Sequence, residues 1–114
     1  MRFSLVLILM LVATPVPAFE PVTDGAQFAR LVSGRALTRL GIRLEVHADG
    51  RITGHGMGRP VVGEWSWRQG YFCRSLFWGG DDLGDDCQAV LREEDRLRFV
   101  TMRGAGIFAD FRLR

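Results

Sequence analysis

The chain has 114 residues, of which 47% are hydrophobic, and a formal net charge of +2 at pH 7. Its cationic side chains are all arginine and are spread without a basic block, so the composition gives no support for a nucleic-acid-binding surface. This length predicts one domain behind any targeting segment.

The first 18 residues have the three parts of a secretory signal peptide. Arg2 gives a positive start, residues 3–13 are almost wholly apolar, and Val16 and Ala18 have the spacing used for cleavage. An apolar run of about 11 residues is too short to cross a bilayer, which takes roughly 20. We therefore expect a signal peptide over 1–18 and a single β-rich domain over 19–114. The product would lie in the periplasm or be secreted, with no membrane span; an uncleaved anchor or a core helix is the alternative.

One helix is predicted near the start of this domain. Asp24 can cap its N-terminus, and Gln27 can complete a capping box. Gly34 suits the C-terminal end. The apolar stripe between these residues consists of Phe28, Leu31 and Val32.

After Arg35 the sequence alternates between apolar and polar residues, with turn residues between the runs. A meander of short strands must curl or close to bury one face. The predicted fold class is therefore mainly β (α+β), with a short N-terminal helix packed on a strongly curved antiparallel β-meander or small barrel. About seven strands are expected, over residues 42–47, 51–57, 62–68, 71–78, 87–92, 97–102 and 107–113.

Turn chemistry predicts the register of the first hairpin. A three-residue loop ending on Gly50 pairs Val46 with Ile52 and Leu44 with Gly54, which keeps the apolar face intact.

The same reasoning at the second hairpin predicts a three-residue loop ending on Gly70. This loop sets Trp65 beside Cys73 on the core face and Glu64 opposite Arg74 as a cross-strand ion pair. The outer face of the second strand would then carry Phe72, Arg74, Leu76 and Trp78.

The two cysteines, Cys73 and Cys87, fall in strands predicted to be neighbours. Two cysteines in an exported chain usually pair, so a Cys73–Cys87 disulfide is predicted. Free buried thiols are the alternative.

The residues carry no recognised catalytic or cofactor motif. The glycine cluster at 54–60 has Arg59 where a dinucleotide fingerprint needs its third glycine, and it lies within a hairpin rather than before a helix. Neither Ser66 nor Ser75 lies on a nucleophile elbow. The acidic residues 81–86 fit a solvated hairpin tip better than a cation site.

No metal site is predicted from the two histidines. The first hairpin places His47 and His55 about 13 Å apart on the outer face, too far for a shared zinc ion.

Four short motifs resemble a known family. They are Leu-Thr-Arg-Leu-Gly at 37–41, Gly-Glu-Trp-Ser-Trp at 63–67, Gly-Tyr-Phe-Cys-Arg at 70–74, and Cys87-Gln88. With the leader and the short helix they resemble a family of small exported alphaproteobacterial proteins of uncharacterised function, often labelled dihydrodipicolinate reductase. The resemblance covers nearly the whole domain and implies export. The label implies a nicotinamide-dependent reductase, but the residues offer no glycine-rich strand-to-helix turn for the pyrophosphate.

These observations favour a non-enzymatic binding or envelope-associated protein, without a cofactor. The partner is expected to be a periplasmic protein or a small apolar ligand. The alternatives are a small enzyme of unrecognised type and a structural or inhibitory protein.

The predicted contact surface combines aromatic and arginine side chains with an acidic recognition loop, a composition typical of binding hot spots. Its carboxylates would steer a basic partner. The surface consists of Phe72, Arg74, Leu76, Trp78, Asp81, Asp82, Asp85 and Asp86. In the alternative, the helix covers Phe72, Leu76 and Trp78 as a second small core under a solvated acidic turn.

Overall fold

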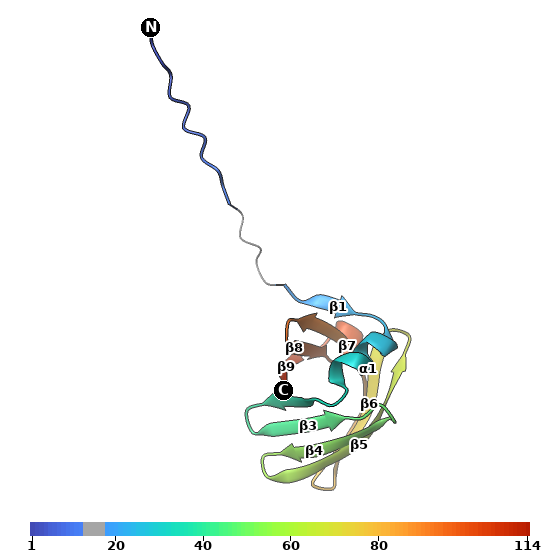
Figure 1. The fold of residues 1–114 in the computed structure, drawn as a ribbon. Helices are drawn as coiled ribbons and strands as arrows, with labels where there is room; N and C mark the ends of the chain where they lie inside the picture. Colours follow the sequence, from blue (N-terminus) through green and yellow to red (C-terminus); the bar gives the residue numbers. More distant parts are fainter. Residues whose placement is uncertain (13–17) are drawn as a thin grey trace.

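The computed structural model describes residues 1–12 and 18–114. Residues 1–12 have no helix or strand (Figure 1). Their side chains are exposed. The predicted cleavage motif lies partly outside the described residues, because Val16 falls in the segment 13–17. Among the described residues, the buried apolar core begins at Val22.

The body of the molecule is an antiparallel β-barrel with one short helix (Figure 1). Strands β2 to β9 close into a barrel of eight strands through the pairing of β7 with β8, and β1 is an additional strand on β7. In chain order the elements are β1 (Glu20–Val22), α1 (Gly25–Val32), β2 (Ala36–Arg39), β3 (Ile42–Val46), β4 (Arg51–Gly56), β5 (Arg59–Arg68), β6 (Tyr71–Trp78), β7 (Asp81–Glu93), β8 (Arg96–Val100), the 3₁₀ turn η1 (Met102–Gly104) and β9 (Phe108–Leu113). No helix within 1–12 or 18–114 is long and apolar enough to cross a membrane.

The predicted mainly β barrel with one helix is confirmed. The structure adds β1 and β2, which have only three and four residues and so show too little alternation to be recognised. The predicted acidic loop is wrong, because β7 already begins at Asp81 and the turn before it is only Gly79–Gly80.

Helix α1 closes one end of the barrel (Figure 1). Its N-terminus is capped as predicted, since the Asp24 carboxylate accepts a hydrogen bond of 2.9 Å from the Ala26 backbone N–H. The Phe28 side chain is fully buried, with its ring centroid 5.1 Å from that of Phe72 and 5.4 Å from that of Trp65. Through Phe28, the helix therefore covers this end of the barrel core with an aromatic side chain.

The first hairpin has the predicted register. Val46 faces Ile52 and Leu44 faces Gly54 across β3 and β4. Both apolar pairs point into the barrel.

The predicted register of the second hairpin is wrong by one residue. Trp65 faces Arg74 and not Cys73, because the turn contains two residues, Gln69 and Gly70. Their φ angles are +53° and +85°, as a type I′ turn requires at both central positions.

A shift of one residue exchanges the two faces of a strand. The face of β6 that carries Phe72 and Leu76 therefore points into the barrel, while Cys73 lies on the outer face. The predicted ion pair between Glu64 and Arg74 is wrong as well, because Glu64 faces Ser75.

A bulge in β7 lets this long strand follow the barrel wall. Ser75 faces Asp85 but Phe77 faces Asp82, so β7 has one residue more than β6 in this interval. Gly84 lies within the bulge at φ +78°, a conformation that favours glycine.

Candidate ligand-binding cavity

The barrel interior holds a cavity of about 260 Å³. Side chains from several strands and from the β8–β9 loop line it. The apolar ones are Leu37, Leu44, Val46, Ile52, Phe72, Leu76, Phe99, Ile107, Phe108, Ala109 and Phe111.

Aromatic packing closes the inner end of the cavity. The Phe72 ring lies 5.4 Å from the Phe99 ring and 5.1 Å from Phe28 of α1. The Phe111 ring packs edge-on to Phe99 at 5.7 Å. These rings form a rigid apolar floor, because each is held by the next in a favourable tilted or edge-to-face arrangement.

Two glycines of the barrel wall lie opposite large apolar residues. Leu44 faces Gly54, and Ile52 faces Gly63. Gly63 is required there by close strand approach, since a Cβ atom would lie 2.1 Å from the Ser75 carbonyl oxygen. At Gly54 a Cβ atom would likewise lie 2.1 Å from the Arg43 carbonyl oxygen, so both glycines allow neighbouring strands of the wall to lie close together.

The β8–β9 loop lies at the open end of the cavity. Ile107 and Phe108 line the cavity yet are 80% and 57% exposed. The loop has internal support, because the backbone N–H groups of Thr101 and Gly106 donate to the carbonyls of Ile107 and Thr101, both at 2.9 Å. The cavity therefore has an ordered apolar rim that meets solvent.

Three polar side chains line the cavity: Arg74, Gln88 and Thr101. The Thr101 hydroxyl donates to the Ile107 carbonyl at 3.2 Å. Gln88 is only 8% exposed and donates from Nε2 to Asp86 at 3.1 Å.

Arg74 reaches from β6 to the bulge of β7, where its Nη1 donates to the Gly84 carbonyl at 2.8 Å. Asp86 is its direct neighbour across the sheet. Within the described residues, however, Arg74 and Asp86 form no ion pair within 4.0 Å. Asp86 accepts instead from the Met102 backbone N–H at 3.1 Å and from Gln88.

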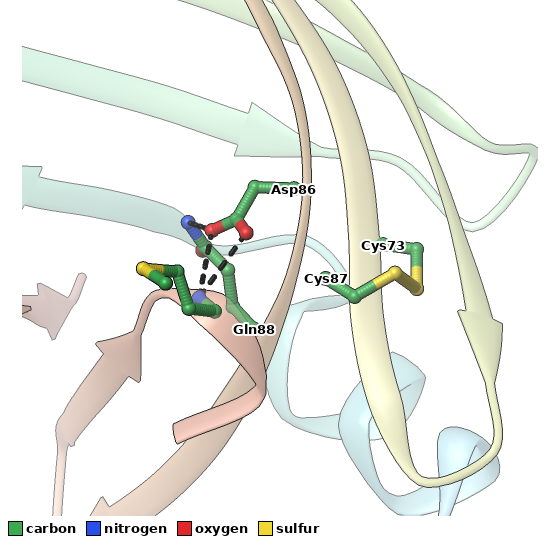
Figure 2. The surroundings of a disulfide bond; sticks show 5 residues. Cys73, Asp86, Cys87 and Gln88 are labelled. Carbon is green, nitrogen blue, oxygen red and sulfur yellow. Dashed lines mark hydrogen bonds between the residues drawn. A yellow bond between two sulfur atoms is a disulfide. The ribbon is translucent and has the colours of Figure 1, made fainter. Parts of the chain in front are cut away.

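The predicted Cys73–Cys87 disulfide is confirmed. The two residues face each other directly on β6 and β7, and Figure 2 shows the bond on the other side of the strands from Asp86 and Gln88. Its predicted position on the core face is wrong, since it borders an outer groove of about 670 Å³ with Arg68 and Arg103. A disulfide of this kind indicates an oxidising compartment.

The residues of the predicted contact surface are divided between two faces of the sheet. Phe72 is 5% exposed, and with Arg74 and Leu76 it lines the cavity. The Trp78 indole donates to the Gly56 carbonyl at 2.8 Å, and its ring is covered by the Arg59 guanidinium at 4.2 Å. The Trp78 side chain is therefore held at the rim of the barrel by these two contacts.

The four aspartates of that surface have different neighbours. Asp81 forms an ion pair of 3.3 Å with Arg59. The Asp82 carboxylate accepts from the Gly84 N–H at 2.8 Å within the bulge. Asp85 borders the outer groove, while Asp86 is held as described above.

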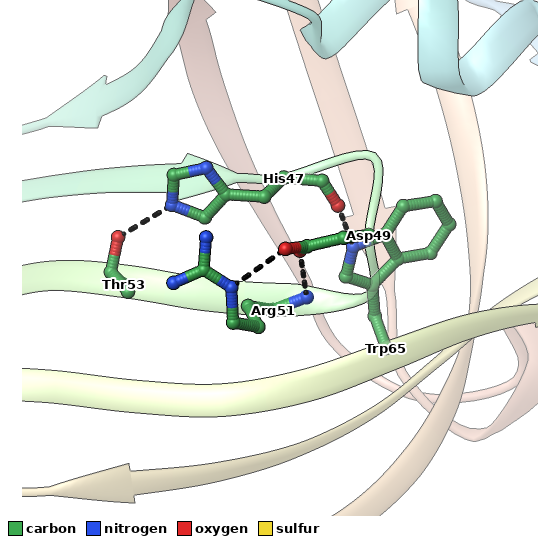
Figure 3. Close-up of polar contacts among 5 residues, drawn as sticks. All are labelled: His47, Asp49, Arg51, Thr53 and Trp65. Carbon is green, nitrogen blue, oxygen red and sulfur yellow. Dashed lines mark hydrogen bonds and ion pairs between the residues drawn. The ribbon is translucent and has the colours of Figure 1, made fainter.

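The first hairpin carries a second polar cluster (Figure 3). His47 Nε2 lies 2.8 Å from the Thr53 hydroxyl, and the His47 carbonyl accepts from the Trp65 indole at 2.7 Å. The Arg51 guanidinium beside Asp49 lowers the pKa of that carboxyl. These contacts stabilise the turn of the first hairpin. In the described part of the chain, no three His, Cys, Asp or Glu side chains are placed to hold a metal ion.

Comparison with protein-family models, curated proteins and solved structures found no match.

The cavity itself was not predicted from the sequence. Its walls combine residues from both ends of the domain, such as Leu37 and Phe111, whose strands β2 and β9 pair directly. The glycines Gly54 and Gly63, which lie opposite Leu44 and Ile52, indicate close strand approach in this part of the wall but do not by themselves predict a cavity.

Proposed function

We propose that this chain is an exported binding protein that holds a small apolar ligand inside its barrel. The observation that carries the proposal is the cavity of about 260 Å³ with its apolar walls. Binding sites for small molecules are typically concave, mostly apolar and provided with a few polar groups. A dry apolar cavity of about 150 Å³ is enough for benzene, so this one suits a ligand somewhat larger than benzene.

Two observations support export. The Cys73–Cys87 bond suits an oxidising compartment. The apolar leader ending at Ala18 has the organisation of a signal peptide. The resemblance to small exported alphaproteobacterial proteins supports the same compartment, and membership of that family is part of the proposal.

The test is binding of a neutral apolar probe, 1-octanol, to the purified oxidised protein, measured by isothermal calorimetry. Ala109 lines the cavity, so Ala109→Leu would fill part of the space. Ala48 is exposed in the turn at the helix-capped end of the barrel, so Ala48→Leu is the matched control. We expect 1-octanol to bind the wild type and Ala48→Leu alike and to bind Ala109→Leu at least tenfold more weakly. Equal binding to all three proteins would place the probe elsewhere and contradict the proposal.

A further inference from the structure

We infer that the ligand is an acid, a medium-chain monocarboxylate whose head group binds Arg74 and whose alkyl tail fills the apolar cavity. The inference rests on the proposed function and adds the ligand class. Among the described residues lining the cavity, Arg74 is the one that carries a charge.

Most N–H donors of the Arg74 guanidinium have no hydrogen-bond acceptor among the described residues. Its one hydrogen bond among the described residues runs from Nη1 to the Gly84 carbonyl, whereas a guanidinium has five N–H donors. A planar guanidinium presents its donors in the geometry that a carboxylate accepts.

The nearest protein carboxylate across the sheet is already engaged. Asp86 accepts from the Met102 N–H at 3.1 Å and from Gln88 Nε2 at 3.1 Å, and both donors hold it beside the β8–β9 loop. Arg74 is thus a half-buried cation next to apolar walls, with a backbone carbonyl and no carboxylate as its partner in the described structure. An anion entering this site would gain a charge-assisted hydrogen bond in a partly desolvated place.

The order of residues along β6 sets the direction of the ligand. Phe72 lies toward the aromatic floor and Leu76 toward the open end, with Arg74 between them. The head group would therefore lie at the level of Arg74, and the tail would run along the apolar wall formed by Leu37, Leu44 and Phe99. The volume of about 260 Å³ suits a medium-length chain such as octanoate.

The test compares three ligands of equal chain length, octanoate, 1-octanol and octylamine, by calorimetry at pH 7. With the wild type we expect octanoate to bind about tenfold more tightly than 1-octanol, as a hydrogen bond to a charged partner allows, and octylamine to bind most weakly. Arg74→Gln should remove the advantage of octanoate over 1-octanol. Arg74→Lys should keep only part of it, because lysine keeps the charge but not the planar donor geometry. Arg96→Gln, which changes an exposed arginine on β8, should behave as the wild type.

The possible failures can be told apart. If 1-octanol binds the wild type as tightly as octanoate, or if Arg74→Gln weakens both equally, the acid-binding inference is overturned while the proposed cavity stands. If neither octanoate nor 1-octanol binds the wild type, the proposed function fails and the inference fails with it. The wild-type comparison decides the inference even if Arg74→Gln does not fold.

Discussion

Arg98 links the start of the domain to the rim of the cavity. Its guanidinium lies 4.0 Å from the ring centroids of both Phe19 and Phe108, and it forms two hydrogen bonds with Asp110, of 2.8 and 3.1 Å. These hydrogen bonds hold the pKa of the Asp110 carboxyl below its ordinary value. The contact holds Phe108, which lines the cavity together with its neighbour Ala109.

We predict that the Arg98–Asp110 pair gives the fold an acid-sensitive component. A carboxylate with a lowered folded-state pKa stabilises the fold above its unfolded pKa, which is about 3.9, and loses this contribution as the pH falls through the folded value. Asp110→Asn should lower the free energy of unfolding at pH 7 by about 1 kcal/mol or less, since the pair is partly exposed. Urea titrations between pH 7 and 2 should show the difference from wild type shrinking below pH ~4. Glu94→Gln, at an exposed turn, is the control, and a difference that stays constant with pH would contradict the prediction.

At the scale of elements, the two hairpins show what sequence reasoning could and could not decide. In the first, only one loop length kept Leu44 and Val46 on the apolar face, so the register could be predicted. In the second hairpin, a two-residue loop and a three-residue loop can both end on Gly70. Because strand β6 has apolar residues on both faces, the apolar pattern did not distinguish the two registers. The choice depends on long-range packing of Phe72 against Phe28, which the local sequence does not contain.

The turn of the second hairpin offers a stability prediction. Gln69 has φ +53°, a left-handed conformation that costs most residues free energy but that asparagine adopts more readily. Gln69→Asn creates the preferred Asn-Gly type I′ pair and should raise the free energy of unfolding by roughly 0.5–1 kcal/mol. Gln27→Asn in α1 is the matched control and should bring no gain, because asparagine is the weaker helix former. Urea unfolding measures both, and a stability of Gln69→Asn at or below wild type would count against the turn assignment.

The disulfide should stabilise the barrel although it lies on the outer face. Cys73 and Cys87 are separated by 14 positions, and closing a loop of about 15 residues contributes about 3 kcal/mol in the chain-entropy model. The double variant Cys73→Ser/Cys87→Ser should lose about this amount in urea unfolding. Wild type measured with a reductant should lose a similar amount, and the double variant should not respond to the reductant. An unchanged unfolding midpoint on reduction would contradict the prediction.

At the scale of the whole molecule, the alternation of apolar and polar residues did not decide whether the sheet closes into a barrel. It depends on β2, where Leu37 pairs with Leu113 of β9, and on the pairing of β7 with β8. Most of the strands follow from alternation and turn residues, so the curved antiparallel sheet could be predicted. Whether such a sheet closes, and whether its interior is filled, depends on contacts between distant segments. The position of Arg74 on the cavity wall follows from that closure together with the register of the second hairpin.

We predict that the exported protein consists of residues 19–114. In the described part of the chain, the buried core begins at Val22 and Phe19 packs on Arg98, so a chain cleaved after Ala18 would keep these contacts. Intact mass of protein recovered from the envelope of an expressing bacterium should match Phe19–Arg114 less two hydrogens, because the cysteines are paired. Ala18→Arg should block processing, since the cleavage site needs a small residue there, and should leave a membrane-associated precursor of full length. An envelope protein that still begins at Met1 would contradict the prediction of a cleaved leader.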